Sequence, residues 1–320
     1  MKNINKLFLV AVTAAVSTAQ AETNPSKIVL DYAYYNPVSL VLKEKKFLED
    51  DVSKDGIKVE WVLSQGSNKA LEYLNSRSVD FASTAGAAAL ILRANGNPVK
   101  SIYVFSKPEW TALLVGKDSK ITSVAELKGK RVAATRGTDP FIFLARALDE
   151  NGLTIKDVEL VALQHADGKN ALLRGDVDAW AGLDPLMAQA EVDSGAKFIY
   201  RNANLNSYGI LNVREDFAKD HPELIVRALK AYEKARLWAL ANPDEFKTLV
   251  ETQAKLNEAV AAKVLERTDL SNSRIGEDQK KTIAAAGEVL KKNGVIGAGV
   301  DVDKTINDLV EPRFAAEAVK

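Results

Sequence analysis

The chain has 320 residues, with 43 basic and 43 acidic side chains, so its formal net charge at neutral pH is zero. Balanced charge gives no electrostatic reason to bind nucleic acid or an anionic membrane. The sequence contains no cysteine, which excludes disulfides, thiolate metal sites and a lipidated N-terminal cysteine. A chain of this length is long enough for two domains with a sizeable core.

Residues 1–21 are predicted to be a signal peptide. Lys2 and Lys6 form a basic start, a short apolar run follows, and the small residues before Glu22 fit cleavage after Ala21. The apolar run is too short to cross a membrane as a helix. We therefore expect a soluble periplasmic protein, whose mature chain of 299 residues (320 minus 21) has a formal charge of about −2 after losing the two lysines.

Two lobes are predicted, the first over residues 22–115 and 208–320 and the second over 116–207. The first lobe begins with alternating strand and helix patterns. We predict its strands at 28–33, 57–62, 79–82 and 99–105, and its helices at 38–49 and 69–75. The segment 111–115 is then expected to cross to the second lobe, with a hinge at 116–119.

The strand at 79–82 leads into a helix that starts at Gly86 and continues with three alanines. Ser83 and Thr84 are good capping residues for this helix. Small residues let an anion approach the free N–H groups of the first turn, where the helix dipole is positive. Two interpretations stay open, an ordinary capped helix in a core and an anion site.

The second lobe repeats this order of elements. Its strands are predicted at 132–135, 158–163, 178–181 and 198–200, and its helices at 141–150 and 171–174. Residues 207–213 return the chain to the first lobe. The rest of the pattern is helical, and we expect these helices to pack on the first lobe, at 223–241, 243–254, 257–267, 278–293 and 302–309.

Two pairs of segments match in the same order along the chain. Residues 27–37 and 130–140 both start with a basic residue, run through a strand and end in Asn-Pro or Asp-Pro, which suits a helix start. Residues 74–81 and 173–180 both lead from a helix end to Val-Asp and a short strand. The repetition predicts two α/β lobes of the same build, with a ligand site at the carboxyl ends of their strands.

Three motifs carry a resemblance to a known family. They are the sequence G-S-N-K-A-L at 66–71, the sequence S-T-A-G-A-A-A after Val-Asp, and D-A-W-A at 178–181 followed by Asp-Pro. Over residues 25–315 the chain resembles periplasmic substrate-binding proteins of the nitrate/sulfonate/taurine class, and especially the aliphatic sulfonate-binding proteins of ABC importers. The resemblance implies an α/β fold of two lobes, the type II periplasmic binding protein fold, which closes on its ligand.

The resemblance also implies a ligand site between the lobes. A sulfonate stays ionised, so neutral N–H and O–H donors at helix starts suit it, and Trp180 would pack against its alkyl or aryl tail. No cofactor and no metal is expected, the partner is an ABC importer permease in the inner membrane, and the protein is expected to be a monomer. The implied contacts come from Asn36, Ser67, Ser83, Thr84 and Gly86 in the first lobe, and from Gly137, Thr138, Trp180 and Asp184 in the second.

Several points stay open at this stage. Asp139 and Asp184 either cap helices or hold the ammonium group of an aminosulfonate such as taurine. Trp110 is either a core residue whose indole N–H needs a partner or an apolar wall of the cleft. The ligand could also be a sulfate ester, a nitrate-like anion or another small molecule.

An enzyme is the alternative of another class, because the resembled fold is also used by a pyrimidine synthase that depends on cysteine and histidine. This chain has no cysteine and only His165 and His221. We interpret His165 as a loop histidine with its hydrogen bonds satisfied rather than as a general base, and His221 as a helix cap before Pro222. The sequence also lacks the metalloprotease, nucleophile-elbow and Walker motifs, so we expect no enzymatic activity.

Overall fold

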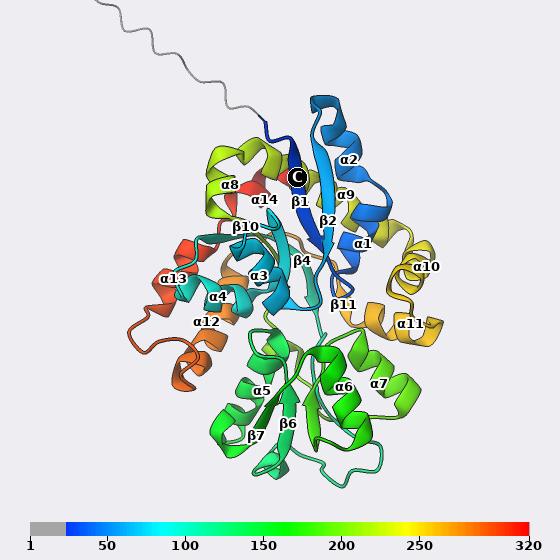
Figure 1. Ribbon diagram of the computed structural model, residues 1–320, viewed down its shortest axis with the longest axis vertical. Helices are drawn as coiled ribbons and strands as arrows, with labels where there is room; N and C mark the ends of the chain where they lie inside the picture. The colour runs from blue at the N-terminus through cyan, green and yellow to red at the C-terminus, as the bar shows by residue number, and fades with distance from the viewer. Residues whose placement is uncertain (1–23, 320) are drawn as a thin grey trace, which may run out of the picture.

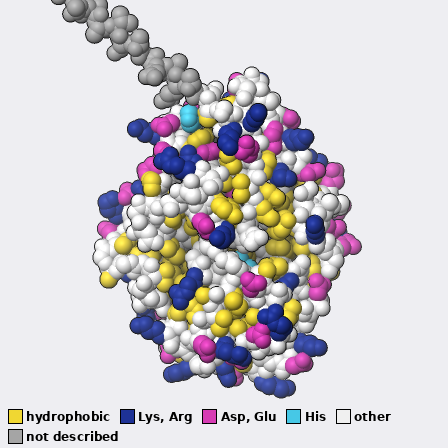
Figure 2. All heavy atoms as spheres, viewed as in Figure 1, with side chains coloured by type: hydrophobic (Ala, Val, Ile, Leu, Met, Phe, Trp, Pro, Cys, Tyr) yellow, Lys and Arg dark blue, Asp and Glu magenta, His cyan; other side chains and the backbone are white. Residues whose placement is uncertain are grey.

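The computed structural model describes residues 24–319, so the predicted signal peptide lies outside the described residues. Figure 1 shows two α/β lobes, one above the other, with the chain crossing between them. Within residues 24–319, no helix is both long enough and apolar enough to cross a membrane. Basic and acidic side chains are intermixed over the face seen in Figure 2, as the balanced charge predicts.

The first lobe contains a six-stranded sheet in the order β11-β4-β10-β3-β1-β2. The central strands β1 and β3 pair in parallel, and their residues are almost entirely buried because helices cover both faces of the sheet. The strands are β1 (Lys27–Tyr32), β2 (Lys58–Leu63), β3 (Phe81–Ala85), β4 (Val99–Pro108), β10 (Gly209–Arg214) and β11 (Thr268–Asp269).

The second lobe contains a five-stranded sheet in the order β7-β6-β8-β5-β9. Its strands are β5 (Leu113–Val115), β6 (Arg131–Ala134), β7 (Glu159–Ala162), β8 (Ala179–Ala181) and β9 (Lys197–Tyr200). The first sheet contains the same arrangement as β2-β1-β3-β10-β4, with three parallel strands followed by an antiparallel one. The two lobes predicted from the repeated segments are therefore confirmed.

The crossings between the lobes differ from the prediction in position. β5 pairs with β8 and β9 and so belongs to the second sheet, which places the first crossing at residues 109–112 rather than at 111–115. The expected hinge at 116–119 instead lies within the second lobe, after β5. The return crossing covers residues 201–208, between β9 and β10. A sequence pattern could not separate crossing from strand here, because both are short and apolar.

Helices surround both sheets. The first lobe carries α1 (Pro37–Glu44), α2 (Phe47–Val52), α3 (Ser67–Asn75), α4 (Gly86–Ala94) and α8 (Glu215–Asp220), and the second carries α5 (Asp139–Glu150), α6 (His165–Arg174) and α7 (Leu186–Ser194). Proline occupies one of the first two positions of α1 and α5, as the Asn-Pro and Asp-Pro sequences predict.

Five of the six C-terminal helices follow the predicted ranges closely, and the last one, Arg313–Ala318, was not predicted. They do not all pack on the first lobe alone. They are α9 (Pro222–Ala241), α10 (Pro243–Ala254), α11 (Glu258–Glu266), α12 (Glu277–Lys292), α13 (Val302–Leu309) and α14 (Arg313–Ala318). α9 packs on α1 and α14, as expected, but α11 contacts α7 and α12 contacts α5 in the second lobe. Val260 and Val264 form a small core with Ala188 of α7, so apolar packing itself connects the lobes.

Candidate functional site

Three helix starts meet where the two lobes face each other. Gly66 and Asn68 at the start of α3 approach Gln164 and His165 at the start of α6, and Asn68 also lies beside Gly137, just before α5. A Cβ atom on Gly66 would lie 2.7 Å from Nε2 of His165, and one on Gly137 would lie 3.5 Å from Cβ of Asn68. We call this contact between the lobes, formed by these five residues, the seam.

Within the described residues, the helix starts at the seam receive no side-chain cap from the residue before them. The residues just before α3, α5 and α6 are Gly66, Thr138 and Gln164, and in the described part of the chain none of their side chains caps its own helix. Thr138 instead donates its hydroxyl hydrogen to the carbonyl of Thr135, at 2.6 Å. Uncapped first-turn N–H groups and three positive dipole ends at one place favour an anion.

His165 is the only titratable side chain among the five seam residues, and it is 3% exposed. The hydroxyl of Thr135 donates to the carbonyl of Leu163 at 2.7 Å, so it accepts from Nδ1 of His165 at 3.1 Å. This network assigns the proton to Nδ1 and leaves Nε2 as an acceptor. Burial lowers the pKa of His165 to about 3, so the imidazole is neutral at physiological pH.

The start of α4, where the sequence leaves an anion site and an ordinary capped helix open, is occupied from within the protein. The N–H of Gly86 donates to the carbonyl of Ser207 at 3.1 Å, and the N–H of Ala87 donates to the hydroxyl of Ser207 at 3.0 Å. Ser207 lies on the return crossing, close to Gly86 in space but 121 residues away in sequence (207 minus 86). The crossing therefore takes the place that an anion would take.

The two hydroxyls before α4 are also engaged inside the first lobe. Ser83 donates its hydroxyl hydrogen to Asp31 at 2.9 Å, while Thr84 donates to the carbonyl of Ala85 and accepts from Asn212 at 2.7 Å. Asp31 is fully buried, and burial raises its pKa to about 6. The hydroxyls of Ser83 and Thr84 are thus hydrogen-bonded within the first lobe.

Asp139 is the centre of a buried network that joins both crossings to the second lobe. Its carboxylate accepts from the indole N–H of Trp110 at 2.8 Å, and from the hydroxyl and N–H of Ser207 at 2.6 and 3.1 Å. Burial raises the pKa of Asp139, against the lowering effect of these hydrogen bonds. Asp139 is therefore neither a helix cap nor free to hold a ligand ammonium group.

This network also decides between the two interpretations of Trp110. The side chain is buried, its indole N–H has Asp139 as a partner, and its ring makes an edge contact with Tyr35 at a centroid distance of 5.9 Å. Trp110 is therefore part of the core between the lobes, on the first crossing.

Asp184 takes part in a second contact between the lobes. Its carboxylate accepts from the N–H of Ala188 at 2.8 Å, which caps the first turn of α7, and lies 3.5 Å from the guanidinium of Arg267. Arg267 also pairs with Glu191 on α7. Burial raises the pKa of Asp184 to about 7, with Arg267 acting in the opposite direction. Arg267 follows α11, so this ion pair connects the C-terminal helices to the second lobe.

The remaining predicted residues lie beside the seam or inside the lobes. Ser67 is the first residue of α3, and its hydroxyl accepts from the N–H of Ala85 at 3.0 Å. Asn36 caps α1 through the N–H of Ser39 and donates to Ser83. Trp180 is fully buried in the core of the second lobe, where a Cβ on Gly168 would lie 2.7 Å from its Nε1.

Of the predicted contacts, Gly137 lies in the seam, and Ser67 and Thr138 lie beside it at the starts of α3 and α5. Asn68, Gln164 and His165 were not among the predicted contacts, and His165 is the first residue of α6 rather than a loop residue. The Gly-Ser-Asn sequence at 66–68 was a usable signal. No local signal marked Ser207, because its role depends on a partner far away in sequence.

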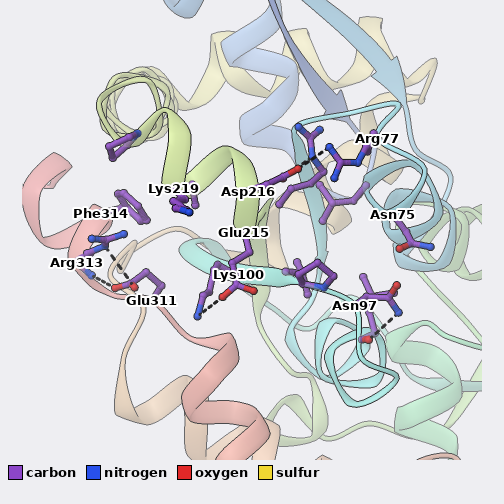
Figure 3. A pocket seen from close by; sticks show the side chains of 17 residues that line it. Asn75, Arg77, Asn97, Lys100, Glu215, Asp216, Lys219, Glu311, Arg313 and Phe314 are labelled. Carbon is purple, nitrogen blue, oxygen red and sulfur yellow. Dashed lines mark hydrogen bonds and ion pairs between the residues drawn. The ribbon is translucent and has the colours of Figure 1, made fainter. Parts of the chain in front are cut away.

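One well-formed cavity lies away from the seam. It measures about 800 Å³ and lies in the first lobe, near the start of β4 and the end of β10. Figure 3 shows ion pairs within its lining, with Arg77 directed to Asp216 and Lys100 to Glu215. The lining as a whole contains five basic side chains and three acidic ones, so it has a basic excess.

A smaller pocket of about 280 Å³ reaches the seam. Asn68 and Gly137 of the seam line it, together with the apolar Leu71, Ala88, Ile91 and Leu92 and the polar Glu72, Asn75 and Asn95. A lining that mixes polar and apolar side chains is typical of sites for small amphipathic molecules. Within the described residues, no group of three or more histidine and acidic side chains is placed to hold a metal ion.

Comparison with known proteins agrees with this architecture. Residues 43–246 match the family described as NMT1/THI5 like. The chain is 31% identical to a putative aliphatic sulfonates-binding protein of Bacillus subtilis, over 88% of this chain and 84% of that protein. It is also 29% identical to 4-amino-5-hydroxymethyl-2-methylpyrimidine phosphate synthase of Uromyces fabae, over 62% of each chain.

A solved structure shows the same fold. The alkanesulfonate-binding protein SsuA from Xanthomonas axonopodis pv. citri, bound to MOPS, superposes with a TM-score of 0.82 at 21% identity, over 90% of this chain and 98% of that one. At this identity the likeness concerns the fold, and it confirms the predicted two-lobed periplasmic binding protein architecture.

Proposed function

The chain belongs to the NMT1/THI5-like family, and we propose that it is the substrate-binding protein of an ABC importer that captures a small organosulfonate between its two lobes. The observation that carries this proposal is the meeting of three uncapped helix starts at the seam. The exported location that the N-terminal sequence predicts, the periplasm, is part of the proposal.

A sulfonate suits this site for electrostatic reasons. It keeps its negative charge at every physiological pH, and its three weakly basic oxygens accept from N–H donors without needing a basic side chain. First-turn N–H groups of α3 come from one lobe and those of α5 and α6 from the other, so an anion between them would hold the lobes together. A ligand that binds the closed state more tightly favours closure.

The seam supports binding better than catalysis. The sequence supplies no cysteine nucleophile, and the proton of His165 is directed at Thr135 inside the second lobe. A general base needs a pKa near the working pH, whereas the pKa of His165 is about 3. The similarity to a pyrimidine phosphate synthase therefore concerns ancestry and fold, and we propose no reaction for this chain.

The test is thermal stabilisation of residues 22–320 by a panel of anions at neutral pH. The panel contains short and long alkanesulfonates, an aromatic sulfonate, a sulfate ester, nitrate, sulfate and bicarbonate. A ligand at a hundred times its Kd raises the free energy of unfolding by about 2.7 kcal/mol. Stabilisation by at least one sulfonate is expected. If only nitrate or only the sulfate ester stabilises the protein, that anion and not a sulfonate is the ligand.

A further inference from the structure

The seam contains two hydrogen-bond acceptors, one from each lobe, that lie close to each other beside Gly66. A Cβ on Gly66 would lie 2.7 Å from Nε2 of His165 and 3.0 Å from Oδ1 of Asn68, so both atoms border the same position. Both atoms are buried, and among the described residues neither has a hydrogen-bond partner. We call these two atoms the acceptor pair.

Buried acceptors of this kind carry a cost unless a donor reaches them. An unsatisfied buried acceptor destabilises the protein, and a ligand that supplies a donor removes this cost. Neither atom of the pair is a donor for the other, because the proton of His165 is held on Nδ1 by Thr135. The acceptor pair therefore discriminates between ligands that carry a donor and ligands that do not.

Resting on the proposed function, we propose that the preferred ligand is a sulfonate with a hydroxyl group close to its head, and that His165 and Asn68 recognise this hydroxyl. His165 is then a residue that determines specificity. The sulfonate would lie at the helix starts, the hydroxyl would donate to the acceptor pair, and the rest of the molecule would extend into the 280 Å³ pocket lined by Asn68 and Gly137.

A neutral donor fits better than an ammonium group for two reasons. Three helix N-termini place positive potential at the seam, which opposes a second positive charge there. The buried carboxylate of Asp139 is also fully engaged with Trp110 and Ser207, so it offers no countercharge to an amine. A hydroxyl group can donate to the acceptor pair without adding a positive charge and without needing a carboxylate as countercharge.

The experiment compares three ligands that differ in one group. Calorimetric titration measures Kd for ethanesulfonate, 2-hydroxyethanesulfonate and 2-aminoethanesulfonate with the wild-type mature chain. We expect the hydroxyl compound to bind at least about tenfold more tightly than either of the others. Equal affinities, or tightest binding of the amine, would overturn the inference while leaving the proposed function intact.

Variants then assign the selectivity to the acceptor pair. His165→Leu is expected to reduce the ratio between hydroxyl and plain ligand to near one, by weakening the hydroxyl compound. His221→Leu, which changes the only other histidine, is the matched control and keeps the wild-type ratio. If His165→Leu retains the ratio, His165 does not recognise the hydroxyl and the inference is wrong.

Asn68→Ala provides an independent check, because Asn68 is only partly buried and the substitution leaves the core of the second lobe unchanged. Asn68→Ala is expected to lower the ratio of the affinities for the hydroxyl and the plain ligand. This variant keeps the test possible if His165→Leu folds poorly. An unchanged ratio would contradict the role of Asn68. If the folded wild-type chain binds none of the sulfonates, the proposed function itself is wrong, a result distinct from binding without selectivity.

Discussion

The start of α4 and the seam are built from the same local chemistry, small and polar residues ahead of a helix, yet the fold uses them in opposite ways. At α4 the first-turn N–H groups bind Ser207, which the return crossing brings in. At the seam the N-termini of α3, α5 and α6 are uncapped by their preceding side chains. The same signal thus builds an internal connection in one place and a candidate anion site in the other.

This difference teaches that a helix start is a site only when no other part of the chain fills it. The S-T-A-G sequence has every feature that favours an anion, but a residue 121 positions further along the chain reaches it first. The comparison predicts that changes around α4 and Asp139 reduce stability, whereas changes at the seam reduce ligand affinity.

The largest effect is expected from Asp139→Ala. It leaves the indole of Trp110 and the hydroxyl and N–H of Ser207 without their buried acceptor, which we expect to lower the free energy of unfolding by about 3 kcal/mol. Urea denaturation measures the change. Asp167→Ala, at an exposed position of α6, is the control, and equal stability of both variants would show that the network contributes little.

The next largest effect is expected from Gly66→Ala, which tests the seam directly. The added methyl group would lie 2.7 Å from Nε2 of His165, so the lobes could not approach as they do here. Overpacking of this kind costs about 1–3 kcal/mol, or roughly a tenfold to hundredfold loss in sulfonate affinity. Gly116→Ala is the matched control, because a Cβ there meets nothing within 4 Å. If Gly66→Ala binds the sulfonate with wild-type affinity, the seam is not part of the ligand site.

A smaller, pH-dependent effect is expected from Asp31→Asn. The pKa of Asp31 is about 6 in the folded protein, above its ordinary value of 3.8. Between these two pH values the folded state binds more protons than the unfolded state, so the wild-type protein loses stability as the pH rises through this range. Asparagine has no such titration. Asp31→Asn should therefore gain about 2 kcal/mol relative to wild type between pH 4 and pH 7. If the free energies of unfolding of Asp31→Asn and wild type differ by the same amount at pH 4 and at pH 7, the raised pKa is contradicted.

The smallest effect is expected from Thr84→Val. The hydroxyl of Thr84 bonds to Ala85 and Asn212 inside the first lobe, so its loss should lower stability by about 1 kcal/mol and leave sulfonate affinity unchanged. Thermal unfolding and calorimetric titration of the same sample separate the two effects. A loss of sulfonate affinity without a loss of stability would indicate that the ligand binds at the start of α4, and would contradict the comparison with the seam.

The sequence by itself determined the elements and the two-lobed fold. Hydrophobic periodicity, the Asn-Pro and Asp-Pro helix starts and the repeated segments are local or regularly spaced signals, so 27–37 and 130–140 predicted equivalent strands and helices correctly. The Gly-Ser-Asn sequence likewise marked the start of α3, because a helix start depends mainly on its own few residues.

Only the tertiary structure decided which helix starts are occupied and which polar atoms are satisfied. Ser207 reaches α4, Trp110 and Ser207 reach Asp139, and Arg267 reaches Asp184, all across long stretches of sequence. The role proposed for His165 depends on two contacts: its Nδ1 is hydrogen-bonded to Thr135, and its Nε2 lies close to Gly66 of the opposite lobe. Hydrogen bonds and burial depend on distances between segments that the crossings bring together, and no local pattern records those distances.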